Sequence, residues 1–312
     1  MSKGATAFLF PGQGSQAVGM GRDLWEHSPA GRAVFQQADQ ILGFPLSQLC
    51  FQGPKETLGD TANAQPAIFV ASYALWQALR ATGHAPEPAF LAGHSLGEYT
   101  ALVAAGVLGF EDAVRLVRQR GEAMKAAGAA NPGGMAAILK LESEVVEACC
   151  QRAQAATGGV IQVANYNSPG QIVVSGDAEA LAAASALAKE AGGRVMPLPV
   201  SVATHSALMA PARQAMAAAL TALPLRSPAT PVVGNVSARL LETPDAVRQE
   251  LLAQLTSPVR WVQSVEHMAA QGTQRLVEVG PGNVLTGLVR RILPDLAVHN
   301  VGDWAAVQAW QG

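Results

Sequence analysis

Short apolar runs alternate with longer amphipathic runs along the first 130 residues. Apolar residues are nearly continuous over 6–10 and again just before Ser95, which is typical of short buried strands. The stretches with helical spacing of apolar positions are 21–40, 65–81, 99–108 and 111–127. Strands that alternate with helices favour an open parallel sheet covered by helices. We therefore expect an α/β protein.

The alternation changes at the turn-forming segment 131–134, Asn-Pro-Gly-Gly. The pattern then predicts a strand, a helix, two strands, a helix and a strand, over 135–141, 143–157, 160–166, 171–175, 178–191 and 194–198. This βαββαβ order is typical of a ferredoxin-like subdomain. We expect it to span 131–199.

The alternation of strands and helices seen in the first 130 residues resumes after residue 200. Helices are predicted over 207–223, 244–255, 262–271 and 283–292, and strands over 231–235 and 275–279. We therefore expect one core built from 1–130 and 200–312, with 131–199 inserted into it. A cleft between two such parts is the natural place for a site.

Composition and charge exclude several classes of function. The chain has 312 residues and a formal net charge of −2, so it presents no overall basic field for nucleic acid. No stretch reaches the ~20 apolar residues of a membrane span, and we expect no membrane association. The three cysteines have neither disulfide parity nor metal-ligand spacing. We therefore predict a cytoplasmic protein with free thiols and no metal.

Ser95 is the first candidate for chemistry, because it lies at the centre of a G-x-S-x-G pentapeptide between a strand and a helix. Gly93 and Gly97 would let the strand and the helix close around a tight bend that exposes the serine hydroxyl. The helix N-terminus would direct free N–H groups at the same point. Ser95 is thus a candidate nucleophile. The alternative is a serine that caps the helix.

A serine nucleophile needs a base, and His94 and His205 are the histidines to compare. Neighbours on a sharp turn point apart, so we expect no bond between His94 and Ser95. His205 lies where the chain leaves the inserted subdomain, at the edge of the expected cleft. We expect it to titrate near ~6–7 as a base, although a surface or core histidine is the alternative. Since Asp112 and Asp177 begin helices, a dyad fits better than a triad.

Arg120 is the second charged candidate. It shares a helix face with the apolar positions 113, 116, 117 and 124, whereas Arg115 and Arg118 can pair with Glu111 and Glu122 on the solvated side. A buried guanidinium needs a partner. It is either a bidentate clamp for a substrate carboxylate or a side chain that reaches the surface or caps carbonyls.

Seven segments in this order resemble the malonyl-CoA:acyl-carrier-protein transacylases. They are 8–16 (FLFPGQGSQ), 65–67 (QPA), 93–98 (GHSLGE), 120–121 (RG), 165–171 (NYNSPGQ), 205–206 (HS) and 278–282 (EVGPG). The resemblance covers nearly the whole chain. It implies an α/β-hydrolase-like core with a ferredoxin-like insertion, which agrees with the pattern of elements.

The resemblance also implies a role for individual residues. Ser95 would carry the acyl group, His205 would be its base, and Arg120 would hold the malonyl carboxylate. The oxyanion donors would be the backbone N–H groups of Gln13 and Leu96. The carbonyl that orients the histidine would belong to Gln254.

The implied reaction is malonyl transfer from malonyl-CoA to an acyl carrier protein through a malonyl-serine, without a metal or redox cofactor, by a monomer. Leu96 and the segment 202–205 resemble those of malonyl-selecting members, yet one methyl is worth only ~1–3 kcal/mol in a pocket, so methylmalonyl stays an alternative. A carrier-protein acyl hydrolase is the second alternative, but relatives of that kind typically lack the arginine. A silent docking partner is the third, but it would not require Ser95, His205 and Arg120 together.

Overall fold

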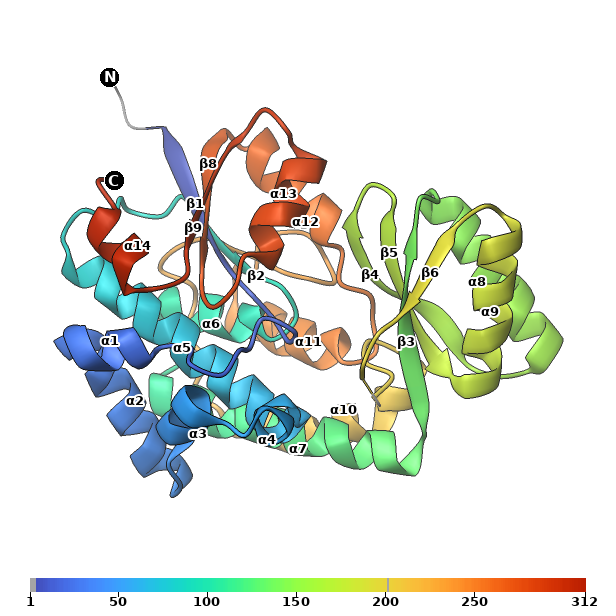
Figure 1. Ribbon diagram of the computed structural model, residues 1–312, viewed down its shortest axis with the longest axis horizontal. Coiled ribbons are helices and arrows are strands. Elements are labelled where there is room, and N and C mark those ends of the chain that lie inside the picture. Colours follow the sequence, from blue (N-terminus) through green and yellow to red (C-terminus); the bar gives the residue numbers. More distant parts are fainter. Residues whose placement is uncertain (1–3, 201) are drawn as a thin grey trace.

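The computed structural model describes residues 4–200 and 202–312 and contains two β-sheets that lie side by side (Figure 1). Met1, Ser2, Lys3 and Ser201 lie outside the described residues. The first sheet takes its strands from the blue, cyan, orange and red parts of the chain, and the second from the green and yellow part between cyan and orange.

The first sheet has five parallel strands in the order β7-β2-β1-β8-β9. Their bounds are Val232–Val233 (β7), Phe90–Gly93 (β2), Ala5–Phe10 (β1), Thr273–Val279 (β8) and Ala297–Val301 (β9). The central strand β1 is buried on both faces, as its continuous apolar run predicts. Its alternate residues point to two different helical layers.

Phe8 and Phe10 point to the larger helical layer, and Ala7 and Leu9 to the smaller one. The larger layer contains α1 (Arg22–His27), α2 (Pro29–Leu42), α3 (Leu46–Gln52), α4 (Lys55–Gly59), α5 (Thr61–Ala81), α6 (Gly97–Ala104), α7 (Phe110–Ala130), α10 (Ala210–Ala222), α11 (Pro244–Gln254) and α14 (Trp304–Ala309). The smaller layer contains α12 (Trp261–Ala270) and α13 (Val284–Ile292). The sheet is therefore covered on both faces, as predicted.

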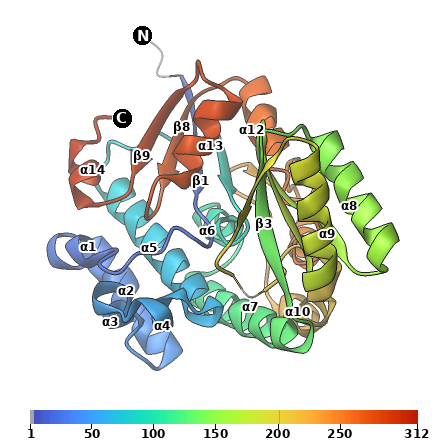
Figure 2. The ribbon, with the colours of Figure 1, turned by 45° about the vertical axis from the view of Figure 1, so that its right-hand side comes forward.

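The second sheet is antiparallel, with the order β4-β5-β3-β6. Its strands are Ile161–Ser168 (β4), Gln171–Asp177 (β5), Gly133–Leu139 (β3) and Arg194–Pro197 (β6). The helices α8 (Ser143–Thr157) and α9 (Ala178–Glu190) pack on one face (Figure 2). The predicted βαββαβ order is confirmed, and so is the mixed α/β class.

A short backbone contact joins the segment after α11 to the second sheet. The Val259 N–H donates to the Ala164 carbonyl over 2.8 Å, and the Tyr166 N–H donates to the Val259 carbonyl over 2.9 Å. The segment that follows α11 thus pairs in parallel alongside the edge strand β4 at Asn165. These bonds hold the inserted sheet against the core.

The structure corrects several predicted elements. The single helix expected over 21–40 is two helices, because Pro29 starts α2 and the Ser28 side chain caps it by accepting from the Gly31 N–H over 3.1 Å. The short helices α3, α4 and α14 were not predicted. Neither was β9, an edge strand whose alternating exposed and half-buried residues include a histidine and an asparagine. Among the described helices, none is long and apolar enough to cross a membrane.

Candidate active site

The strand β2 turns into α6 through His94, Ser95 and Leu96. Ser95 has a φ of 52°, in the left-handed region that a residue with a side chain rarely adopts. The bend is tight because a methyl group on Gly93 would run into the Gly97 backbone, and one on Gly97 would run into the Phe10 backbone. The pentapeptide therefore forms the predicted strained turn.

Ser95 does not cap the helix. The N-cap of α6 is Leu96, and no side chain caps it. Instead, the Ser95 N–H donates to Asn235 Oδ1 over 2.7 Å, and its hydroxyl lies 2.9 Å from His205 Nε2. Asn235, which follows β7, thus holds the backbone of the turn, and the Ser95 hydroxyl faces a possible base.

His205 is buried and its ring orientation is fixed. Its Nδ1 lies 2.8 Å from the Gln254 carbonyl oxygen, which can only accept, so Nδ1 carries the proton and Nε2 is free to accept from Ser95. Burial, and then the charge of Arg120, lower the pKa of His205 from 6.5 to about 3. The expected titration near ~6–7 is therefore wrong for this environment: the imidazole stays neutral at neutral pH.

His94 points elsewhere, as the geometry of a sharp turn predicts. Its Nε2 lies 2.8 Å from Asn167 Oδ1, and its ring packs edge-on against Trp261 with 5.5 Å between centroids. Burial lowers its pKa. Of the two histidines compared in the sequence, only His205 contacts the Ser95 hydroxyl.

Arg120 is 1% exposed, so a guanidinium that reaches the surface is excluded. Its Nη1 donates to Gln65 Oε1 over 2.6 Å, and its Nη2 donates to Gln254 Oε1 over 2.8 Å and to Ser95 Oγ over 3.1 Å. The guanidinium carbon also lies 5.4 Å from the centre of the Tyr99 ring. All three acceptors are side-chain oxygens, so Arg120 does not cap backbone carbonyls.

Gln13 lies in the loop that follows β1, and Leu96 follows Ser95 in the turn before α6. Gln13 follows β1, and its side-chain oxygen accepts from Thr61 Oγ1 over 2.9 Å. The two loops are tied by the His94 N–H, which donates to the Phe10 carbonyl over 3.0 Å. Within 4–200 and 202–312, neither the Gln13 nor the Leu96 backbone N–H donates to another protein atom. Both donors are free to meet a developing oxyanion.

Three buried polar residues contact this group and received no role in the sequence analysis: Gln65, Glu98 and Asn235. Glu98 and Asn235 are bonded to each other and to the turn around Ser95. Gln65 and Glu98 stand inside two of the segments that carry the resemblance, and Asn235 ends a predicted strand. A polar residue within an otherwise apolar segment was therefore the sequence feature that could have identified them.

A cavity of about 770 Å³ opens onto Ser95, His205 and Arg120. The core lines it with the 11–16 loop and with Leu285 and Leu288 of α13, and the second sheet lines it with Met135 and Val173. It is therefore the predicted cleft between the two parts. In the described part of the chain, no group of three His, Cys, Asp or Glu side chains could hold a metal.

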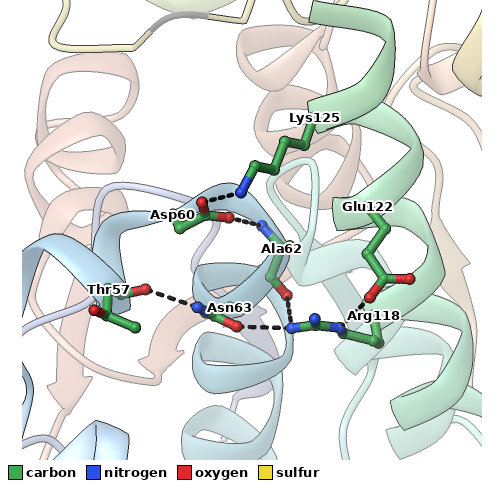
Figure 3. A network of polar contacts seen from close by, with 7 residues as sticks. All are labelled: Thr57, Asp60, Ala62, Asn63, Arg118, Glu122 and Lys125. Carbon is green, nitrogen blue, oxygen red and sulfur yellow. Dashed lines mark hydrogen bonds and ion pairs between the residues drawn. The ribbon is translucent and has the colours of Figure 1, made fainter. Parts of the chain in front are cut away.

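Asp60 and Lys125 line this cavity and belong to a second polar network, shown in Figure 3. Lys125 on α7 pairs with Asp60, which caps α5 by accepting from the Ala62 N–H over 3.0 Å. Arg118 pairs with Glu122 over 2.6 Å, as its spacing predicts, and also donates to the Ala62 carbonyl over 3.0 Å and to Asn63 Oδ1 over 2.7 Å. The pair Arg115–Glu111, at 2.9 Å, is also confirmed. One helix thus carries exposed Arg115, half-buried Arg118 and buried Arg120.

Comparisons with known proteins agree with this geometry. Residues 7–310 match the acyl transferase domain family. The malonyl CoA-acyl carrier protein transacylase of Escherichia coli K12 is 46% identical over 304 residues, which is 97% of each chain. The enzyme of that name from Bacillus subtilis 168 is 45% identical, over 95% of this chain and 93% of its own length.

Solved structures agree as well. An acyl carrier protein S-malonyltransferase from Vibrio cholerae superposes with a TM-score of 0.94 at 46% identity, covering 97% of this chain and 99% of its own. A malonyl-transacylase in complex with a type II polyketide acyl-carrier protein superposes with a TM-score of 0.95 at 41% identity, covering 98% and 99%. The chain belongs to the acyl transferase family that contains the malonyl CoA-acyl carrier protein transacylases.

Proposed function

We infer that the protein transfers a malonyl group from malonyl-CoA to the thiol of an acyl carrier protein. Relatives that match along nearly their whole length are named for this reaction, and one related structure holds a carrier protein. The observation that carries the inference for this chain is the contact of one buried arginine, Arg120, with the hydroxyl of Ser95. A cation at that place suits an acyl group that ends in a carboxylate.

The first half-reaction forms an ester on Ser95. His205 Nε2 takes the hydroxyl proton as Oγ attacks the thioester carbonyl carbon, and the Gln254 carbonyl steadies the imidazolium through Nδ1. The oxyanion accepts from the Gln13 and Leu96 N–H groups. The C–S bond then breaks, and the CoA thiol leaves with the proton from His205.

The second half-reaction repeats these steps with the carrier-protein thiol. His205 removes the thiol proton, the sulfur attacks the malonyl ester carbonyl, and Ser95 Oγ leaves and recovers its proton. Arg120 holds the malonyl carboxylate through both halves. Because one site serves two substrates in turn, the kinetics should be ping-pong.

Acyl-enzyme formation tests this function. Incubation with malonyl-CoA should add one malonyl mass to the intact protein, and Ser95→Ala should abolish both the adduct and transfer. Addition of a carrier protein should then move the malonyl group to its thiol. Release of free malonate at the rate of adduct decay would favour the hydrolase alternative, and an adduct on Ser95→Ala would disprove the nucleophile.

Three further points belong to the same proposal. We assign 131–199 as the inserted subdomain and 1–130 with 200–312 as the core. We place the protein in the cytoplasm, in keeping with three free cysteines that are all buried. We take the monomer as the working unit, which light scattering at assay concentration would test.

A further inference from the structure

Glu98 is a buried acid that the mechanism does not use. It lies in the first turn of α6, three positions after Ser95, and is 0% exposed. Its Oε1 accepts from the Asn235 N–H over 2.9 Å and from Asn235 Nδ2 over 3.2 Å, and its Oε2 accepts from Gln254 Nε2. Every group that bonds to this carboxyl group is a donor, so both of its oxygens act as acceptors, although burial and the charge of Glu250 raise the pKa of Glu98.

The Gln254 side chain connects Glu98 to Arg120. Its Nε2 donates to Glu98 and, over 3.0 Å, to the Ser95 carbonyl, whereas its Oε1 accepts from Arg120 Nη2 over 2.8 Å. A reversed amide would direct its NH₂ group at the guanidinium and its oxygen at two acceptors. Glu98 and the Ser95 carbonyl therefore allow one orientation of the amide.

The Arg120 guanidinium is held by neutral hydrogen-bond acceptors of this kind. Within the described residues no carboxylate forms an ion pair with it, and the side-chain oxygens that it contacts belong to Gln65, Gln254 and Ser95. Of these, Gln254 is the one that also bonds to an acid. The amide thus lies between the Glu98 carboxyl group and the Arg120 guanidinium.

We propose that Glu98 is a positioning residue for malonyl selection: it fixes the Gln254 amide, and through this amide it fixes the Arg120 guanidinium. The proposal rests on the proposed role of Arg120 as the clamp for the malonyl carboxylate. Glu98 itself touches no substrate. Its effect should therefore appear in the choice between donors with and without a carboxylate.

An isosteric substitution exposes this role. In Glu98→Gln, the new amide must direct its NH₂ group either at the Asn235 backbone N–H or at Gln254 Nε2. The Asn235 backbone N–H cannot turn, so the new NH₂ group faces the NH₂ group of Gln254. If the Gln254 amide rotates to relieve this, its own NH₂ group faces the Arg120 guanidinium. The carbonyl of Gln254 that orients His205 is unchanged by this rotation. The clamp is disturbed while the nucleophile and base keep their contact.

Glu250→Gln is the matched control. Glu250 is a second acid, 6% exposed, and its carboxylate accepts from the Val236 and Ser237 N–H groups. Glu250 lies one turn before Gln254 on α11 and its charge helps to raise the pKa of Glu98, but within the described residues its carboxylate makes no hydrogen bond to Arg120, Gln254 or Ser95. Both variants remove one buried acid at constant volume, so a general loss of stability affects both. Steady-state kcat/KM for malonyl-CoA and acetyl-CoA is measured for each, together with the melting temperature.

Glu98→Gln should lower the ratio of malonyl to acetyl kcat/KM by roughly tenfold to a hundredfold, the effect of one mispaired buried donor. Glu250→Gln should leave the ratio unchanged. Gln254→Met removes the amide but keeps the carbonyl, and it should lower the ratio similarly. The double variant Glu98→Gln/Gln254→Met should be no worse than Gln254→Met alone, because both act through one amide.

An unchanged ratio in folded Glu98→Gln would overturn the proposal. If that variant does not fold, an unchanged ratio in Gln254→Met would overturn it, because the amide would then not hold Arg120. Arg120→Ala, assayed alongside, separates this failure from failure of the proposed function. A donor-selective loss in Arg120→Ala with none in Glu98→Gln contradicts only the role of Glu98, and no selective loss in Arg120→Ala contradicts the clamp itself.

Discussion

Replacement of Arg120 by alanine should separate malonyl transfer from transfer of an acyl group without a carboxylate. The guanidinium is 1% exposed and within 3.1 Å of the Ser95 hydroxyl, so a carboxylate that it binds is shielded from water. Loss of one partner from such a charge pair costs about 2–5 kcal/mol. This corresponds to a loss of roughly thirtyfold to several thousandfold in kcat/KM for malonyl-CoA.

Acetyl-CoA should lose far less, because it leaves no carboxylate unpaired. The loss is not expected to be zero, since Arg120 also donates to the nucleophile. Arg120→Lys keeps the charge but not the planar two-pronged donor, so its kcat/KM for malonyl-CoA should lie between the values of the unsubstituted protein and of Arg120→Ala. The pattern across donors is therefore more informative than any single rate.

The assay is steady-state kcat/KM for both donors, with circular dichroism to check folding. Arg115→Ala is the matched control, because Arg115 lies on the same helix and pairs with Glu111 on the exposed side. It should leave both rates near those of the unsubstituted protein. Equal losses for malonyl-CoA and acetyl-CoA in Arg120→Ala would refute the reasoning and make Arg120 a structural residue.

Further predictions concern the base and the turn. Burial lowers the pKa of His205 from 6.5 to about 3, so the base stays neutral on mild acidification. The value of kcat/KM for malonyl-CoA should therefore fall only well below pH 6.5, and a fall in activity near pH 6.5 would contradict this. His205→Ala should slow acylation in rapid-quench experiments by about 10²–10⁴-fold, and His94→Ala far less, whereas the opposite ranking would reassign the base. Gly97→Ala forces a methyl group into the Phe10 backbone and should lower the free energy of unfolding in urea by about 1–3 kcal/mol. Gly287→Ala, on α13 with open space around it, should not lower it, and equal stability of the two variants would refute the close approach.

Much of the fold was predictable because its signals are local. The apolar run of β1 and the glycines around Ser95 act within a few residues, so the strand, the turn and the following helix could be inferred from adjacent positions. The βαββαβ order was equally visible. The edge strand β9 was not, since an edge strand buries little and needs no apolar run. The break at Pro29 was also missed, although a serine before a proline is a helix-start signal.

For the site, the sequence by itself determined which residue types were available and the strained turn that presents Ser95. It left open whether Arg120 was buried or solvated and what His205 contacted. Those points depend on hydrogen bonds between residues 110 positions apart, for Ser95 and His205, and 134 positions apart, for Arg120 and Gln254. Such bonds exist only where the tertiary structure brings α7, α11, the turn at Ser95 and the segment around His205 together. The pKa of His205 and the environment of Glu98 were decided by the same packing, because burial and neighbouring charges are properties of the assembled core.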